Sequence, residues 1–296
     1  MATSSSDDMK AAAINVLCPV TIQLLKEPSV QHAKALTKAL EEIDVRVIQE
    51  LQTYIIFPLE AGLRDKNVSE CLLLNLCEAS YTVFKKSRVL SIKIFYQLYT
   101  TILTILSKSR LQVPAKLSEE SETALIKTIM LMLQASDENV LSEFYSINYI
   151  HILAQQITVL INIAKLDKSR ELQKLALNCI LQFMQEGTKY GEVNAVKLGD
   201  VFAHCLPGIV TGMVLVVTGS SNQGQAVFVP KPNYPKDSVD AQLKSLYVER
   251  SQSWVKSTSK HLGPVIDAIC GLVSNSHWKV RQTVVDFAQQ LLMTCS

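Results

Sequence analysis

Cysteine and histidine are the side chains of this sequence best suited to nucleophilic or metal chemistry. No two cysteines form a C-x-x-C pair and no H-E-x-x-H stretch occurs, while the adjacent His204 and Cys205 would diverge by about 100° on a helix and could not share one metal ion. A catalytic Cys–His pair needs proximity only in space, so chance pairs stay open, but no spacing singles one out. We predict no enzyme, no cofactor and no metal site. The full sets are Cys18, Cys71, Cys77, Cys179, Cys205, Cys270 and Cys295, and His32, His151, His204, His261 and His277.

Phosphate-binding and nucleic-acid-binding patterns are also missing from the sequence. There is no G-x-x-x-x-G-K-[ST], G-x-G-x-x-G or G-x-S-x-G, and the glycines of 219–224 are not followed by Lys-Ser/Thr. Lys plus Arg is 29 and Asp plus Glu is 27, a net charge of +2, and no run of five like charges occurs. Nucleic-acid binders carry a basic stripe. We therefore expect no nucleic-acid partner.

The sequence gives no sign of export or of a membrane span. An odd number of scattered cysteines favours a reducing compartment. The first ten residues lack a basic region followed by an apolar core. The apolar stretch 209–218 is about half the ~20 residues that a spanning helix needs. We expect a soluble intracellular chain.

The apolar residues recur with the period of a helix. The chain is 48% hydrophobic and 19% charged, and its 10 glycines and 9 prolines are too few for the turns of a β-sandwich or barrel. One face of 172–184 is apolar at helical spacing, and Gln173, Lys174, Asn178, Gln182 and Gln185 fill the other face. The apolar positions are Leu172, Leu175, Ala176, Cys179, Ile180, Phe183 and Met184.

The same pattern predicts about a dozen helices. Pro58 should kink or break the helix that contains it. Ser118 should cap the start of its helix, where Glu119 and Glu120 suit the helix dipole. The predicted helices lie at about 10–26, 30–50, 48–64, 68–86, 90–108, 118–134, 138–147, 149–165, 169–186, 193–218, 239–273 and 276–294.

So many helices favour an all-α HEAT/armadillo-like solenoid of stacked antiparallel hairpins over a single bundle. At ~40–47 residues per repeat the chain could hold roughly six repeats. HEAT repeats commonly place Asp five residues before a Val-Arg-type pair; Asp167 precedes Leu172, and Asn275 precedes Val280, at that spacing. Trp278 is expected to pack between hairpins. The predicted repeat-signature residues are Pro58, Asp167, Leu172, Pro207, Trp278, Val280 and Arg281.

These patterns divide the chain into four parts. Residues 1–9 are expected to be a flexible N-terminus and 10–218 to be HEAT-like repeats. Residues 219–238, with three prolines between Pro230 and Pro235, should be an exposed loop, because closely spaced prolines forbid a helix. Residues 239–296 are expected to continue the same solenoid.

Four separated stretches give the chain a family resemblance. Together they resemble, in the right order, the N-terminal part of the Tel-two-interacting protein one family, the scaffold subunit of the Triple T complex. Members of that family are much longer, and they carry a longer segment where 223–239 lies. The stretches are Ile48–Leu59, ending F-P-L; Lys197–Ile209, with L-G-D and L-P-G-I; Trp254–Lys256 with Lys260–Leu262; and His277–Arg281, reading H-W-K-V-R.

The resemblance implies a non-enzymatic scaffold and co-chaperone. Its implied partners are the other Triple T subunits, the phosphatidylinositol-three-kinase-related kinases and, indirectly, the heat-shock chaperone system. Its implied setting is the cytoplasm, with the nucleus as a second location, in TOR signalling and the DNA damage response. The alternative is another HEAT-repeat adaptor, such as a transport receptor, which should show a strongly acidic concave face.

Overall fold

A computed structural model of the chain describes residues 3–65, 67–110, 117–166 and 169–188, and in the C-terminal part residues 252, 256, 262–263, 266–267, 269–274, 276 and 278–295. Nearly every described segment is helical. The helices are α1 (Thr3–Lys26), α2 (Val30–Glu42), α3 (Val45–Arg64), α4 (Glu70–Lys86), α5 (Ile92–Arg110), α6 (Glu119–Ala135), α7 (Glu138–Phe144), α8 (Ile150–Leu166), α9 (Arg170–Thr188) and α13 (Trp278–Cys295), with 3-10 turns η1 (Ile147–Tyr149) and η2 (Leu272–Ser274).

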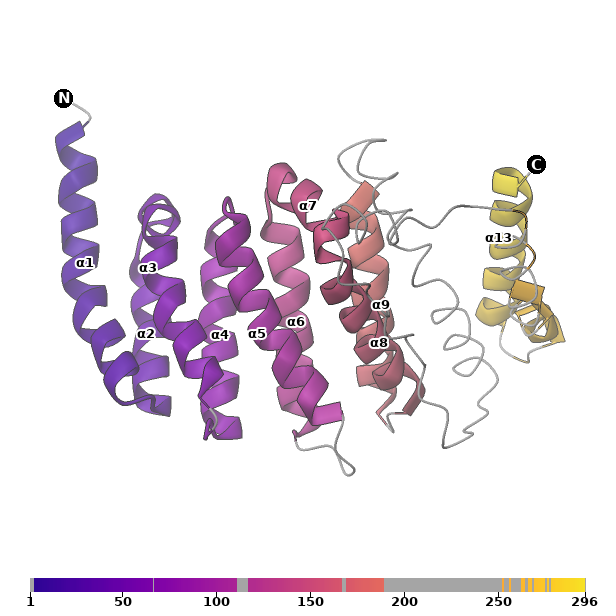
Figure 1. Cartoon of the computed structure of the whole chain (residues 1–296), viewed down its shortest axis with the longest axis horizontal. Coiled ribbons are helices and arrows are strands. Elements are labelled where there is room, and N and C mark those ends of the chain that lie inside the picture. The colour runs from indigo at the N-terminus through magenta and orange to yellow at the C-terminus, as the bar shows by residue number, and fades with distance from the viewer. Residues whose placement is uncertain are drawn as a thin grey trace, which may run out of the picture.

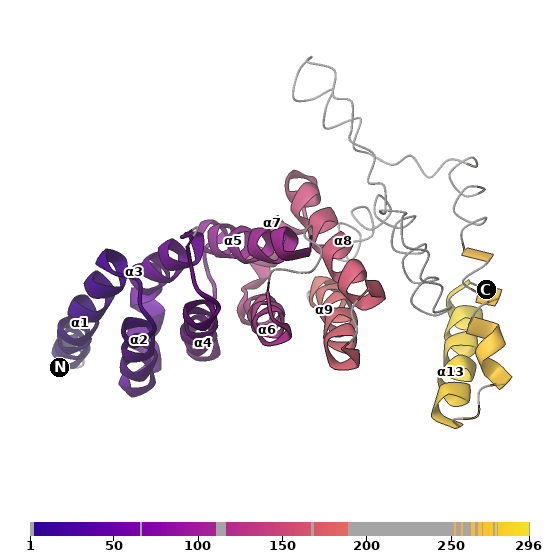
Figure 2. The same ribbon diagram turned by 90° about the horizontal axis from the view of Figure 1, so that it is seen from below.

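The helices from α1 to α9 form two layers. The outer layer holds α1, α3, α5 and α8, each in contact with the next, and the inner layer holds α2, α4, α6 and α9 in the same way. Paired helices of the two layers are antiparallel neighbours (Figure 1). The stack curves, and the inner layer lies on the inside of the curve (Figure 2). This arrangement confirms the predicted all-α solenoid.

The repeat length follows from where the inner helices begin. They start at residues 30, 70, 119 and 170, which are 40, 49 and 51 residues apart. That spacing is nearer the ~40–47 residues of a HEAT repeat than the 34 of a tetratricopeptide repeat. Each repeat buries its apolar stripe against its neighbours, so the core runs without interruption along the stack.

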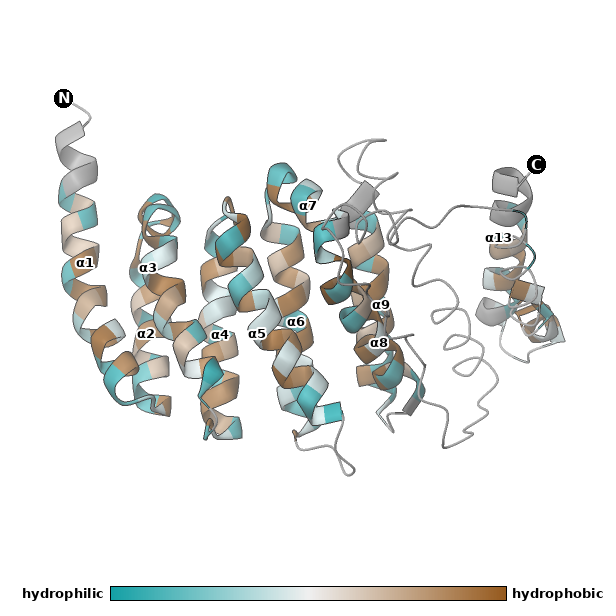
Figure 3. Cartoon of the chain, in the orientation of Figure 1, coloured by the Kyte–Doolittle hydropathy of each residue, from teal (hydrophilic) through white to brown (hydrophobic). Residues whose placement is uncertain are grey.

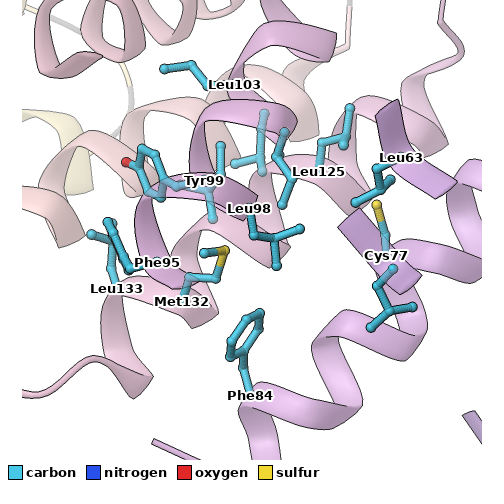
Figure 4. Packing of buried hydrophobic residues seen from close by; sticks show 14 of the residues in the cluster. Leu63, Cys77, Phe84, Phe95, Leu98, Tyr99, Leu103, Leu125, Met132 and Leu133 are labelled. Carbon is cyan, nitrogen blue, oxygen red and sulfur yellow. The ribbon is translucent and has the colours of Figure 1, made fainter. Parts of the chain in front are cut away.

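The core lies between the layers. Apolar residues occur along every helix from α2 to α9 (Figure 3). At the interface of α5 and α6, the buried Leu98 and Tyr99 lie near Met132 (Figure 4). Along α9 most of the predicted face is buried, but Leu175 is only partly buried and Met184, at its end, is exposed. Gln182, predicted to face solvent, is instead buried and donates a hydrogen bond from Nε2 to the Met130 carbonyl oxygen at 2.7 Å.

Three predicted boundaries differ from the structure. The predicted helix 30–50 is broken, because α2 ends at Glu42 and Asp44 caps α3 by accepting from the Arg46 N–H at 2.8 Å. Pro58 does not break α3, which runs continuously from Val45 to Arg64. Helix α1 begins at Thr3, so residues 3–9 are helical rather than a separate tail. The predicted loop 219–238 lies outside the described residues.

Helix α1 has the composition of a possible membrane span. Among the described residues, 8–26 is a helix long and apolar enough to cross a bilayer by length and composition. It nevertheless packs on α2 and α3 and buries Ala13, Leu17 and Leu24. Core helices of soluble proteins meet the same composition test.

Candidate protein-interaction surfaces

The structure places only some of the predicted repeat-signature residues. Pro58 is buried within α3 and Leu172 is buried on α9, as packing residues should be. Asp167 and Pro207 lie outside the described residues.

The remaining signature residues belong to α13. Trp278 is its first residue and is 58% exposed, so the predicted packing between hairpins is not seen in the described part of the chain. Arg281 donates from Nη1 to the Ser276 carbonyl oxygen at 2.9 Å and so ties the helix to the preceding turn. Val280 lies in the first turn of α13, but its side chain is outside the described residues.

The signature that the structure does show is a serine before each inner helix. The side-chain oxygens of Ser29, Ser69, Ser118 and Ser169 accept a hydrogen bond from the backbone N–H three residues later, at 3.2–3.3 Å. A serine there satisfies one of the N–H groups that a helix start leaves unpaired. The predicted cap at Ser118 is confirmed. The other three were missed, although Ser before an apolar helical stripe is a readable signal.

Carboxylates link these caps from one repeat to the next. Glu70, the first residue of α4, accepts hydrogen bonds from the Ser118 N–H at 3.2 Å and the Ser121 hydroxyl at 3.3 Å. Glu119, the first residue of α6, accepts from the Ser169 hydroxyl. The hydrogen bonds from Ser118, followed by that from Ser121, lower the pKa of the Glu70 carboxyl. These contacts join the same ends of α4, α6 and α9.

Side-chain amides and one lysine join the opposite ends of the repeats. Gln49 donates from Nε2 to the Arg88 carbonyl oxygen at 2.9 Å and accepts from the Arg88 N–H at 2.7 Å. Lys86 donates to the carbonyl oxygens of Leu40 and Glu41 at 2.8 and 2.6 Å, which suits a cation at a helix C-terminus. The Val89 N–H, just after α4, also donates to the Ala135 carbonyl oxygen at the end of α6 at 2.9 Å, so α4 and α6 are tied at both ends and keep a fixed register.

That register aligns exposed side chains across the inner layer. The residue twelve positions after the capping serine is Tyr81 on α4, Met130 on α6 and Leu181 on α9. Tyr81 is 41% exposed, Leu181 is 53% exposed and Met130 is partly buried. We call these three residues the inner row. Glu41 takes the same position on α2. Consecutive inner helices are in contact, so the inner row is a set of three apolar side chains, two exposed and one partly buried, at equivalent positions of neighbouring inner helices.

Charges of both signs surround the inner row. Nine residues after each capping serine stand Lys38, Glu78, Lys127 and Asn178. Lys85 is exposed one turn beyond Tyr81. The inner face of the described helices is therefore mixed in charge, not strongly acidic.

A cluster of aromatic rings supports the outer layer near the start of α5. The buried Phe144 of α7 lies 4.7 Å from Phe95 and 5.0 Å from Tyr99, centroid to centroid, and 6.4 Å from Phe183. Tyr99 is fully buried and its hydroxyl donates to Oε1 of Gln156 on α8. Burial is the main cause that raises the pKa of Tyr99. Helices α5 and α7 are in contact and lie next to each other in Figure 2.

Above this cluster the surface has a depression of about 400 Å³, which we call the Tyr96–Tyr149 depression. The two tyrosine rings lie 5.6 Å apart with planes tilted by 59°. The Tyr149 hydroxyl donates a hydrogen bond to Oε1 of Glu143 at 3.4 Å. Burial, followed by the charge of this neighbouring carboxylate, raises the pKa of Tyr149. The depression is lined by Ile92, Lys93, Tyr96, Asn148, Tyr149 and His151.

The buried thiols are not arranged for catalysis. Burial raises the pKa of both Cys77 and Cys179 to about 12, so neither is a thiolate near neutral pH. Among the described residues, no three His, Cys, Asp or Glu side chains gather as a metal site would require.

Comparison with known sequences finds a protein family and two relatives to which this chain is similar. The family model for the TTI1 N-terminal TPR domain matches residues 15–231 and 229–296. The chain is 28% identical over 319 residues to the TELO2-interacting protein 1 homolog of Mus musculus and 27% identical over 318 residues to that of Homo sapiens. Each match covers 98% of this chain and 29% of the relative, so the chain spans less than a third of their length. No solved structure matches the chain significantly.

Proposed function

Since the chain belongs to the family of the TTI1 N-terminal domain, we propose that it is a non-catalytic scaffold that binds other proteins along its stacked helices. The observation that carries this proposal is the inner row, because the exposed Tyr81 and Leu181, with the partly buried Met130 between them, can pack against a partner in register. Tyrosine is also among the residues enriched in binding hot spots.

The partner proposed first is a TELO2-type protein. Both relatives carry the name TELO2-interacting protein, and this chain aligns with one part of them over nearly its whole length. By the family resemblance, the proposed assembly is the Triple T complex. Its proposed task is to support the folding, stability and assembly of phosphatidylinositol-three-kinase-related kinases together with the heat-shock chaperone system. The proposed setting is the cytoplasm, with the nucleus as a second location.

A different adaptor role, such as a transport receptor, is the second candidate. That role calls for a strongly acidic concave face. The exposed inner positions instead alternate lysines, such as Lys38 and Lys127, with the acidic Glu78. The mixed charge favours the scaffold proposal.

Affinity purification of the tagged chain from cells tests the proposal. We expect the TELO2-type protein to co-purify, with or without the kinases, and the kinases to fall in abundance when the chain is depleted. Recovery of a small GTPase and transport cargo, with unchanged kinase abundance, would favour the adaptor instead. Circular dichroism of the purified chain, showing the helical signal, is the control for folding.

A further inference from the structure

We propose that the Tyr96–Tyr149 depression binds an acidic side chain, Asp or Glu, carried by an extended segment of a partner protein and flanked there by an aromatic residue. This site lies on the outer layer, away from the inner row, and it is independent of the TELO2-type interaction. Its volume of about 400 Å³ falls within the ~300–1,000 Å³ of ordinary ligand sites.

The polar lining of the depression offers donors for an anion. Lys93 contributes an ammonium, Asn148 an amide and His151 an imidazole, and all three residues are exposed. No described residue forms an ion pair with Lys93 or His151. The carboxylate that touches the lining, Glu143, already accepts the hydrogen bond of the Tyr149 hydroxyl. A carboxylate from a partner would complete charge-assisted hydrogen bonds that the chain itself leaves unmade.

The apolar part of the lining determines which partner residue can lie next to the acidic one. Tyr96 and Tyr149 present ring surfaces and Ile92 an aliphatic one. Aromatic pairs prefer tilted or offset contacts with centroids 4.5–7 Å apart, so a neighbouring aromatic side chain of the partner fits these rings. One lysine and one imidazole are too few to follow a nucleic-acid backbone, whose binding rests on many phosphates. A peptide with one acid beside one ring matches the lining best.

The tyrosine rings of the depression pack against buried aromatic side chains. Tyr149 lies 6.0 Å, centroid to centroid, from Phe144, which is fully buried in the aromatic cluster. Phe144 in turn contacts Phe95, one residue before Tyr96 on α5. A site held in place by packed rings loses little freedom on binding, which favours affinity even for a short peptide.

Fluorescence anisotropy with labelled peptides tests this proposal on the full chain. The probes are a Gly/Ser-rich peptide with a central Phe-Asp-Phe and an otherwise identical peptide with Phe-Asn-Phe. We expect the Asp peptide to bind about tenfold tighter, since charge-assisted hydrogen bonds are roughly twice as strong as neutral ones. The preference should disappear in the double variant Lys93→Glu/His151→Glu, whose exposed positions leave the fold intact, as circular dichroism would verify.

Matched controls separate the possible outcomes. Lys34→Glu changes an exposed lysine on the inner helix α2 and should keep the Asp preference. Equal binding of the two peptides, or an unchanged preference in the double variant, would overturn the proposal. Tighter binding of a phosphoserine peptide would overturn the assignment of the anion as a carboxylate. The double variant should still recover the TELO2-type protein, so this test and that of the proposed function fail independently.

Discussion

Removal of the Phe144 ring is the perturbation that the structure predicts most sharply. Phe144 is completely buried, and its ring lies within 6.4 Å of the rings of Phe95, Tyr99 and Phe183, which come from α5 and α9. Phe144→Ala removes the aromatic ring through which α7 packs against α5 and α9. Phe→Ala at such sites costs about 3–5 kcal/mol, because the transfer free energy and the cavity add.

The expected size of the effect can be stated for urea denaturation. For a loss of about 4 kcal/mol and a slope of about 2 kcal/mol per molar urea, the unfolding midpoint should fall by about 2 M. The matched control is Phe57→Ala on α3, because Phe57 is 60% exposed. Surface substitutions usually change stability by less than about 0.5 kcal/mol, so the control midpoint should hardly move.

Hydrogen exchange locates the same effect along the stack. Because stability in a solenoid comes from each repeat and its immediate neighbours, protection should fall in α5, α7, α8 and α9. It should be largely kept in α2, which contacts none of them extensively. If Phe144→Ala were no more destabilising than Phe57→Ala, or if α2 lost protection equally, the reasoning about the aromatic cluster would be refuted.

Three further outcomes are expected. Tyr99→Phe removes a buried donor and leaves its amide acceptor unpaired, so unfolding free energy should drop by about 1–3 kcal/mol in urea melts; no drop would deny that hydrogen bond. The hydrogen bond from Ser118 lowers the pKa of the Glu70 carboxyl, so the carboxylate stabilises the fold above its unfolded pKa, and this contribution is lost as pH falls through the folded pKa. In Glu70→Gln the melting temperature should therefore depend less on pH over that acid range. An unchanged dependence would argue against the contact between Glu70 and Ser118. In native chain at pH 8, iodoacetamide should label the exposed Cys71 and spare Cys77 on the same helix, whose pKa is raised to about 12, whereas equal labelling would contradict its burial.

The fold was predictable because helical periodicity is a local signal. The apolar face of α9 from Leu172 to Phe183 follows from spacing alone, and burial confirms it. The break between α2 and α3 was missed because the apolar stripe continues across it, while Asp44 marks it only through a hydrogen bond to backbone. Pro58 was expected to interrupt α3, yet tertiary packing holds the helix on both sides of it.

The candidate surfaces were less accessible to sequence reasoning. The inner row needs the register of three helices, which is set by capping serines and by contacts such as that of Glu70 with Ser118. The Tyr96–Tyr149 depression joins residues more than fifty positions apart on α5 and around η1. The depression leaves no spacing motif, because separation along the chain does not encode the stacking of repeats. The inner row stands twelve residues after each capping serine, a spacing that can be recognised only once these serines are identified as helix caps.

Direct binding of the purified chain to a purified TELO2-type protein tests the central claim most closely. Biolayer interferometry would compare the unaltered chain with Leu181→Asp in the inner row and Phe57→Asp on the outer layer, two exposed apolar positions given the same charge. We expect the unaltered chain and Phe57→Asp to bind alike and Leu181→Asp to bind at least about tenfold more weakly, as a hot-spot change should. No binding by the folded chain, or equal binding by all three, would contradict the assignment of the inner row as the surface that holds the partner.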